Sequence, residues 1–577
     1  MSATEDSTES FYSTVIANPF STTGAYISCY YTWMIDAVIS FLGHYLLPHR
    51  IYFKFKRKEH ECQGMSLLLD FPVFSSILVL VLLLKQLSKK PLEEIMSSVL
   101  TNLKPALLWK HFDEIRKIPH CSKSESPLGD YILEVAKRAG HKARRDRVGN
   151  IVVEKPASPG HEKAETVVLQ GHIDMVCEKN SDVEHDFSKD PIEVEIDGEW
   201  VTAKGTTLGA DNGIGVAAAL AVLEDNSLTH GPLEFLFTVD EETGLTGANA
   251  IEPDFLHGKT LLNLDSEEEG AFFIGCAGGG DSEISLPISR KNSSEGKPLE
   301  VVLTGLRGGH SGIDIHTGRG NGIQLLARML YNLNVSFDLI SLEGGSKHNA
   351  IPREASARIV VPESEVENLK KALQTRFNEI RFEYKAVEKD IVLKIDSLSD
   401  EKRNPMDGKS KDTFLALLVG LPHGVIAMSQ EIPDLVETSN NLAVVRCEES
   451  TVKVYTSSRS SIASALEATR TKVEAIGNLA GAVTKHLEGY PAWTPNLDSP
   501  LLETMKKIYK NLTGKEPEVK AIHAGLECGI IGEKFPGMDM ISFGPDLRHP
   551  HSPDEKVHIG SVERFWNLIV ATLKALA

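Results

Sequence analysis

The sequence predicts an α/β fold in which a mixed sheet flanked by helices is split along the chain around an inserted α+β domain. Two observations support this prediction. Between 166 and 265, apolar runs of strand length end in acidic or histidine residues, as buried strands of an open α/β sheet do. This pattern stops near 285 and resumes near 488, after a section of alternating strand and helix patterns. A domain interrupted in this way is split around an insertion.

The first strand of the split sheet is predicted at 166–170, and it leads directly into His172 and Asp174. Side chains two residues apart on a strand share a face. Asp174 can therefore stand behind His172 and orient its imidazole toward a metal ion. Taken alone, the segment is better explained by a strand-end histidine held by hydrogen bonds.

A glycine-rich turn followed by an alanine-rich, helix-favouring run occupies 206–225 and places Asp211 at the entrance of a helix. A carboxylate there can bridge two cations, because its two oxygens can each face one ion when the ions are about 3.5 to 4 Å apart. The simpler alternative is a helix cap.

The next predicted strand, 233–239, ends in Asp240, Glu241 and Glu242. Three adjacent acids repel one another, which raises their pKa values unless cations neutralise them, and a raised pKa suits a general base. Neighbours on an extended segment point in different directions. We therefore assign Glu241 as the base and Glu242 as a metal ligand, with a solvated turn as the alternative.

A further strand-like run, 259–264, ends in the acid Asp265, and the distant loop 548–560 supplies His551. Open α/β sheets bind ligands at the carboxyl ends of their strands. Imidazoles and carboxylates are the ligands of metal centres that activate water. Taken together, the segments predict a two-metal hydrolase with the ligands His172, Asp211, Glu242, Asp265 and His551.

Nine segments, in this order, carry a resemblance to a known family: GHIDMVCEKN, LGADNGIG, DEETGLTGA, NLDSEEEG, GLRGGHSGIDIH, GGSKHNAIPR, TSNNLAVV, HAGLECGII and HPHSPDE. The sequence resembles the aminoacyl-histidine dipeptidase family, also called peptidase D or cytosol non-specific dipeptidase. The resemblance extends from about Ser97 to the C-terminus. Nine ordered motifs over that length make it highly specific.

The resemblance implies a split zinc-peptidase catalytic domain with an inserted α+β lid domain, and a pair of divalent metal ions, usually zinc, although manganese or cobalt accept the same ligands. It implies cleavage of unblocked dipeptides, among them Xaa-His dipeptides such as β-Ala-His. By the same resemblance, His172 and Asp265 would hold one ion, Glu242 and His551 the other, and Asp211 both. Asp174 and Glu241 would form the catalytic pair.

The resemblance also implies residues that contact the substrate. His310 would stabilise the oxyanion, and Arg459 would bind the free carboxylate of the substrate. Asn349 and Asn441 are weaker candidates for polar contacts, and roles as turn residues explain both equally well. For His310 the alternative is a loop histidine between glycines.

The predicted domains are an N-terminal extension outside the enzyme fold, the first part of the catalytic domain, the lid and the second part of the catalytic domain. Their ranges are 1–94, 95–285, 286–487 and 488–577. The resemblance implies that the lid carries His310 and mediates a homodimer.

Charge and cysteine content exclude some functions. The net charge is -19 and no basic cluster occurs, which argues against nucleic acid as a partner. The seven cysteines form no CxxC pair, and their odd number favours a reducing compartment. We expect Cys177 and Cys528 to be small packing residues. The enzyme part is therefore predicted to be cytoplasmic and away from membranes.

The N-terminal extension contains a run of fourteen apolar residues, 71–84. A bilayer span needs about 20 such residues, so the run is short for a membrane helix. We expect a dispensable extension, with a membrane anchor or a targeting segment as alternatives.

Two other functions stay open from the sequence. One is a related co-catalytic aminoacylase, deacylase or tripeptidase, and the other is a metal-binding scaffold without catalysis. The presence of all seven proposed ligands and catalytic residues argues against the scaffold.

Overall fold

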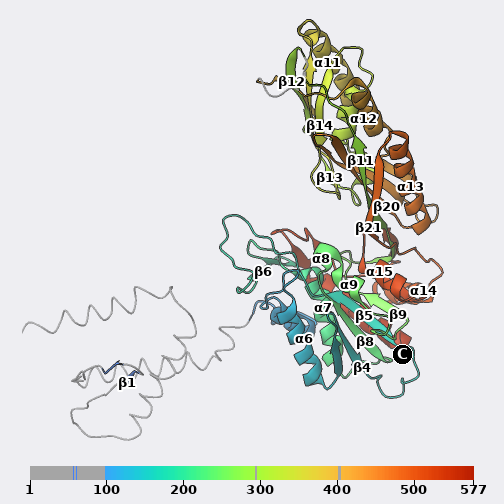
Figure 1. The fold of residues 1–577 in the computed structure, drawn as a ribbon. Helices are drawn as coiled ribbons and strands as arrows, with labels where there is room; N and C mark the ends of the chain where they lie inside the picture. The colour runs from blue at the N-terminus through green and yellow to red at the C-terminus, as the bar shows by residue number, and fades with distance from the viewer. Residues whose placement is uncertain (1–55, 58–59, 62–97, 293–294, 400–403) are drawn as a thin grey trace, which may run out of the picture. The chain divides into compact units, whose positions relative to one another are not determined.

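The computed structural model describes residues 56–57, 60–61, 98–292, 295–399 and 404–577 (Figure 1). The chain forms two compact units, 1–96 and 97–577. In the first unit, strands β1 (Lys56–Arg57) and β2 (His60–Glu61) pair antiparallel. The apolar run 71–84 lies outside the described residues. Within the part that is described, no helix combines the length and apolar character needed to cross a membrane.

The second unit contains an eight-stranded mixed sheet. In spatial order its strands are β22 (Glu518–Ile522), β10 (Ala271–Cys276), β23 (Asp539–Ser542), β9 (Thr260–Asn263), β5 (Val167–His172), β8 (Leu233–Thr238), β4 (Ile151–Lys155) and β3 (Lys142–Arg145). The helices around it are α5 (Ala106–Ile115), α6 (Ser126–Ala139), α7 (Ala210–Glu224), α8 (Glu241–Gly244), α9 (Thr246–Ala250), α14 (Pro500–Thr513), α15 (Glu527–Lys534) and α16 (Ile559–Leu576). Strands from both ends of the second unit thus share one sheet, as a split domain requires.

The central strands form where the sequence predicts them. All six residues of β5 and all six of β8 are buried, as expected for apolar strands covered on both faces. Helix α7 is buried along nearly its whole length, because its alanine-rich surface packs against β5 and α5. A smaller sheet lies beside this region, in the order β24 (Leu547–Arg548), β25 (Lys556–His558), β7 (Trp200–Ala203) and β6 (Val194–Asp197).

A second large sheet has its own hydrophobic core. Its order is β17 (Val392–Ser397), β12 (Lys297–Thr304), β16 (Ala355–Val361), β14 (Asp338–Gly344), β19 (Val436–Cys447), β20 (Thr451–Ser460), β11 (Gly278–Pro287) and β21 (Val483–Tyr490), and β18 (Gly424–Met428) pairs with β19. Its other elements are α10 (Gly322–Leu330), α11 (Val366–Glu383), α12 (Gly408–Gly420), α13 (Ala463–Leu479), the 3-10 helices η1 (Ile315–Thr317) and η2 (Glu363–Glu365), and the paired strands β13 (Gly309–His310) and β15 (Ala350–Ile351).

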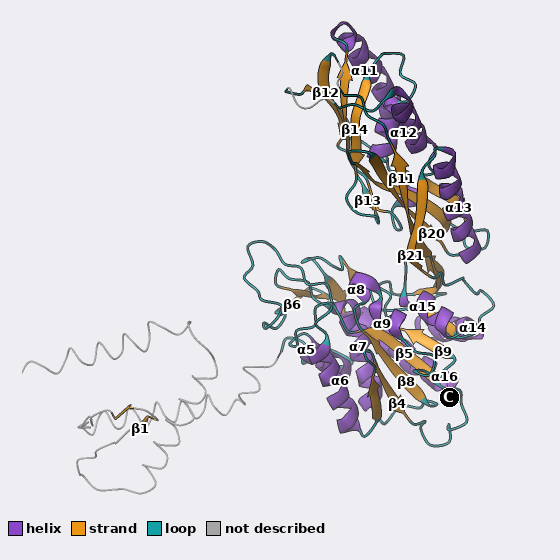
Figure 2. Cartoon of the chain, in the orientation of Figure 1, coloured by secondary structure: helices purple, strands orange, loops and turns teal. Residues whose placement is uncertain are grey.

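Figure 2 shows α11, α12 and α13 along one side of this second sheet, separate from the helices around the first. The predicted α/β fold with a mixed sheet and an inserted α+β part is therefore confirmed. The predicted boundaries at 285 and 487 fall within β11 and β21, and the point at which the lid begins stays a prediction. We use the name lid for the part of the chain that forms the second sheet and its helices.

Candidate metal centre

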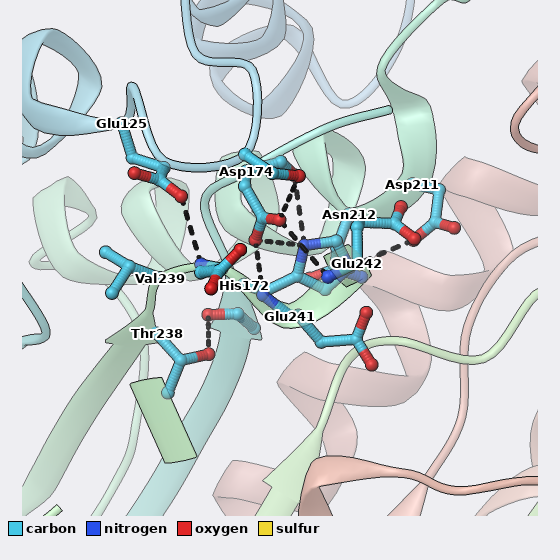
Figure 3. A network of polar contacts seen from close by, with 12 residues as sticks. Glu125, His172, Asp174, Asp211, Asn212, Thr238, Val239, Glu241 and Glu242 are labelled. Carbon is cyan, nitrogen blue, oxygen red and sulfur yellow. Dashed lines mark hydrogen bonds and ion pairs between the residues drawn. The ribbon is translucent and has the colours of Figure 1, made fainter. Parts of the chain in front are cut away.

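Three parallel strands deliver the predicted residues to one edge of the first sheet. Strands β8 and β9 flank β5 in parallel, with His172 opposite Thr238 and Gln170 opposite Asn263. Their carboxyl ends therefore meet at the same edge. Figure 3 shows His172 there, between Asp174 and Asp211.

The ligand candidates form two groups that share one residue. His172 Nε2 lies 3.1 Å from Asp211 Oδ1 and 3.2 Å from Asp265 Oδ1. In the second group, His551 Nε2 lies 3.1 Å from Asp211 Oδ2 and 2.9 Å from Glu242 Oε2. In each group the three ligand atoms lie within 4.8 Å of one another. The two oxygens of Asp211 thus face different histidines, which is the arrangement of a carboxylate that bridges two ions.

One carboxylate oxygen of these groups is buried without a hydrogen-bond donor. Among the described residues, no group donates to Glu242 Oε1, whereas Asp265 Oδ1 faces the His172 imidazole at 3.2 Å. A buried carboxylate oxygen without a donor is costly, and coordination of a cation is one of the few ways to offset that cost. The two groups therefore fit two divalent ions. Imidazole and carboxylate ligands suit zinc, and manganese and cobalt can take the same set.

Asp174 is held behind His172 by donors on several sides. It accepts hydrogen bonds from the Glu241 and Glu242 backbone N–H groups, at 3.0 and 3.2 Å, and from Ser122 Oγ at 2.7 Å. His172 Nδ1 lies 3.3 Å from its Oδ1. Burial opposes ionisation of Asp174, but these hydrogen bonds and the charge of His172 lower its pKa to about 2. Asp174 is therefore a fixed negative charge that orients the imidazole.

The three acids that follow β8 have three different environments. Glu241 and Glu242 begin helix α8 and do not continue the strand, which corrects the extended segment expected from the sequence. Asp240 accepts hydrogen bonds from the hydroxyls of Thr243 and Thr246, so it stabilises the turn. Glu242 belongs to the second ligand group. Burial raises the pKa of Glu241 well above its usual value, and the carboxylates of Asp265, Glu527 and Glu242 add to this rise, which His172 opposes.

The predicted substrate residues lie in the lid, outside the two ligand groups. His310 is on β13, and burial, together with the nearby Arg459, lowers its pKa. Arg459 is only 7% exposed and donates to Tyr490 Oη at 2.7 Å. Among the described residues, no acceptor binds its Nε. Arg459 therefore offers a buried cationic donor beside His310.

Asn349 and Asn441 lie close together in the lid, because Asn441 contacts both chain neighbours of Asn349. Asn441 Nδ2 donates to the backbone oxygens of His348 and Ala350, and the backbone oxygen of Asn349 accepts from Ser311 N at 2.8 Å. Asn349 lies in a turn, as one alternative predicts, whereas Asn441 lies within strand β19, so the role of a turn residue is wrong for Asn441. A direct contact of either side chain with substrate stays a prediction.

The structure corrects one expectation about cysteine. Cys177 is not an isolated packing residue, because it forms a disulfide with Cys121 across 56 residues. The odd cysteine count therefore no longer argues for a reducing compartment. Cys528 is free and buried, and burial raises its pKa well above the usual value, as expected for an inert packing thiol.

Two residues that form hydrogen bonds to the candidate metal centre, Ser122 and Glu555, were not predicted from the sequence. Ser122 donates to Asp174 from 52 residues away, and Glu555 accepts hydrogen bonds from the backbone around Asp211. Neither contact joins neighbours in the sequence. The position of Glu555, four residues after His551 in a motif of the resemblance, was the one available signal.

Comparison with known proteins agrees with this geometry. Residues 168–575 match the peptidase family M20/M25/M40. The chain is 45% identical over 482 residues to the cytosol non-specific dipeptidase of Escherichia coli strain K12, covering 83% of this chain and 99% of that protein. The chain belongs to the peptidase family M20/M25/M40. It is therefore a hydrolase, and the predicted resemblance is confirmed.

A solved structure and a second relative extend the comparison for this M20 peptidase. The crystal structure of aminoacylhistidine dipeptidase from Vibrio alginolyticus has a TM-score of 0.77 and 44% identity, covering 83% of this chain and 98% of that chain. An uncharacterized protein, YqjE, from Bacillus subtilis strain 168 is 27% identical over 278 residues, covering 46% of this chain and 67% of that protein.

Proposed function

We propose that this M20 peptidase is a metal-dependent dipeptidase that hydrolyses unblocked dipeptides, including Xaa-His dipeptides such as β-Ala-His. The observation that carries the proposal is the position of Asp211 between two histidines, each of which also faces a second carboxylate. The two similar proteins of 44 and 45% identity are named as dipeptidases.

In this proposal His172, Asp211 and Asp265 would hold one divalent ion, and Asp211, Glu242 and His551 would hold the other. We favour zinc. Ions bound there supply Lewis acidity, which lowers the pKa of water and stabilises negative charge on a peptide carbonyl oxygen.

In this proposal Glu241 is the general base. The proposal is supported by the place of Glu241 beside His172 and Glu242 and by burial, which raises the pKa of its carboxyl. Glu241 begins α8, next to the ligand Glu242, and its own backbone N–H is fixed on Asp174. Glu241 takes the proton of the attacking water and passes it to the leaving amine. Asp174 keeps the His172 imidazole in one orientation during this step.

Two residues of the lid are proposed to contact the substrate. Arg459 would pair with the free carboxylate, since a guanidinium binds a carboxylate through two parallel hydrogen bonds. His310 would donate to the developing oxyanion. Because His310 belongs to neither ligand group, this role requires a lid residue to approach the metal centre.

Two further proposals concern the cellular location and the oligomeric state of the enzyme. We propose a cytoplasmic location, as the name of the Escherichia coli relative states for that protein. We also propose a homodimer through the lid, where Val425, Ile426 and Met428 of β18 are exposed. Light scattering of the full-length chain would test the dimer.

Hydrolysis of a panel of free and N-acylated dipeptides by the full-length protein tests the function. We expect cleavage of free dipeptides, including β-Ala-His, that stops on chelation and returns with zinc or manganese. Cleavage of N-acylated substrates alone would assign the chain to the deacylases. Cleavage of tripeptides alone would assign it to the tripeptidases, and no turnover with added metal would refute catalysis.

A further inference from the structure

The backbone N–H groups of the turn that carries Asp211, residues 208–211, all donate to the carboxylate of Glu555. Glu555 Oε2 accepts from the backbone N–H groups of Leu208 and Gly209, at 2.7 and 3.0 Å, and its Oε1 accepts from those of Ala210 and Asp211, at 2.8 and 3.2 Å. The side chain is 2% exposed. One buried carboxylate therefore satisfies four consecutive backbone donors.

The backbone of this turn is shaped to bind an anion. Gly209 has a φ of 69°, in the left-handed region, and a Cβ at this position would lie 2.9 Å from Met175 Sδ. Successive N–H groups that point to one side form a nest for negative charge. The nest binds a carboxylate of its own chain.

Glu555 also belongs to the loop that carries His551. Its backbone N–H donates to Ser552 at 3.0 Å, and its backbone oxygen accepts from Thr202 Oγ1 at 2.9 Å on β7. The hydrogen bonds of Ser552, with His549 and Asp554, stay within the loop. Glu555 thus connects the His551 loop to a turn more than 340 residues earlier in the chain.

We propose that Glu555 is a positioning residue of the metal centre, which fixes the Asp211 turn against the His551 loop so that both can hold the same ion. This inference rests on the proposed metal pair and not on the identity of the substrate. The His551 side chain is 49% exposed, so the loop has little other burial to keep it in place. His172, in contrast, lies on a buried strand, and Asp265 closely follows another.

The expected effect is a selective loss of metal affinity. Without the Glu555 carboxylate, the ion shared by Asp211, Glu242 and His551 should bind about 10- to 100-fold more weakly, the range measured when partners of metal ligands are removed. The ion held by His172 and Asp265 should be affected less, although Asp211 contributes to both.

Titration of the metal-free, full-length protein with zinc alone, and separately with manganese alone, measures this effect. The test variant is Glu555→Gln, which keeps the size of the side chain but directs an NH2 group at backbone donors. The matched control is Asp554→Asn, the same change of charge at the exposed neighbour in the same loop. We expect one of the two dissociation constants to rise clearly more than the other in Glu555→Gln, and neither to change in Asp554→Asn. Unchanged affinities in Glu555→Gln, or an equal loss in the control, would overturn the proposal.

Two further measurements separate positioning from general stability. Formate added to Glu555→Ala should restore part of the zinc affinity, because the four N–H groups can bind a small carboxylate, and it should not affect Asp554→Asn. In the metal-free natural protein, hydrogen exchange at the amides of 208–211 should be slow. Exchange there as fast as in an exposed loop would refute the contact even if no variant folds. All these readouts are independent of peptide hydrolysis, so a failed dipeptide assay would refute the proposed function and leave this inference standing.

Discussion

The backbone N–H of Glu241 donates a 3.0 Å hydrogen bond to Oδ1 of Asp174. This bond joins the proposed general base to the carboxylate behind His172. The orientation of the metal ligand and the position of the base therefore depend on the same buried charge. A disturbance of Asp174 should consequently affect metal binding and catalysis together, whereas a change in the Glu241 side chain should affect catalysis alone.

Glu241→Gln should separate these two effects. The amide keeps the size of the side chain and leaves the backbone hydrogen bond to Asp174 intact, but it cannot accept a proton from water. We expect turnover of a free dipeptide to fall about 10²- to 10⁴-fold, with two ions still bound. Steady-state kinetics and elemental analysis of the same sample measure both quantities. Substantial turnover in a fully loaded variant would show that another group is the base.

Ser122→Ala should cause a smaller loss. It removes the 2.7 Å hydrogen bond to Asp174, which still accepts from two backbone N–H groups. Hydrogen bonds to a charged acceptor contribute about 1.5 to 3 kcal/mol, which limits the expected fall in kcat/KM to about 10- to 150-fold. Ser124→Ala, at an exposed position of the same loop, is the control and should match the natural protein. Equal values for both variants would argue against a role of the Ser122 contact.

Removal of metal should destabilise the folded protein. Without cations the carboxylates of Asp211, Glu242 and Asp265 are gathered around two histidines. Glu242 Oε1 then has no hydrogen-bond donor in the part of the chain that the structure describes. An ion present at 100 times its dissociation constant adds about 2.7 kcal/mol to the free energy of unfolding. We expect a chelator to lower Tm and zinc to restore it. Asp211→Asn should show a much smaller rise on zinc addition, and a full-sized rise in that variant would contradict the bridging position.

The disulfide should also contribute to stability. Cys121 and Cys177 close a loop across 56 residues, and the chain-entropy argument gives about 4 kcal/mol for a loop of that size. A dithiol reductant should therefore lower the urea midpoint of the natural protein. The double variant Cys121→Ala/Cys177→Ala should start near the lower midpoint and show no further effect of the reductant. If the reductant shifted both proteins equally, it would be acting elsewhere.

Acid should destabilise the protein partly through His111. This side chain is fully buried, 2.9 Å from Tyr131 Oη and 3.2 Å from Glu224 Oε2, and burial lowers its pKa to about 4. The unfolded chain binds this proton near pH 6.5. The stabilising contribution is therefore complete above pH 6.5 and lost as the pH falls to about 4, a change of up to about 3 kcal/mol. Urea unfolding at pH 7 and pH 4.5 in chelator should show a weaker pH dependence in His111→Gln, and an identical dependence would exclude His111 as a source.

The sequence allowed prediction of those parts of the site that local patterns determine. Strands β5 and β8 and the strand-end position of His172 follow from apolar runs that end in polar residues. The short helix α8, which carries Glu242, does not follow from such a run. The contacts of Ser122 and Glu555 could not be predicted, because they join loops whose paths depend on packing of the complete domain. The pairing of Cys121 with Cys177 escaped prediction for the same reason.

The chain enters and leaves the lid on two neighbouring strands, β11 and β21. In the pairing of β11 with β21, Gly280 lies opposite Gly489. The chain therefore enters and leaves the lid at adjacent positions. Residues 281–488 form one continuous insertion between them. A short turn joining these two glycines would bypass the segment without changing the strand order of the eight-stranded sheet. The shortened chain would keep all five proposed ligands and lack His310 and Arg459, so the residues proposed to hold the ions and those proposed to contact the substrate lie in separable stretches of the chain.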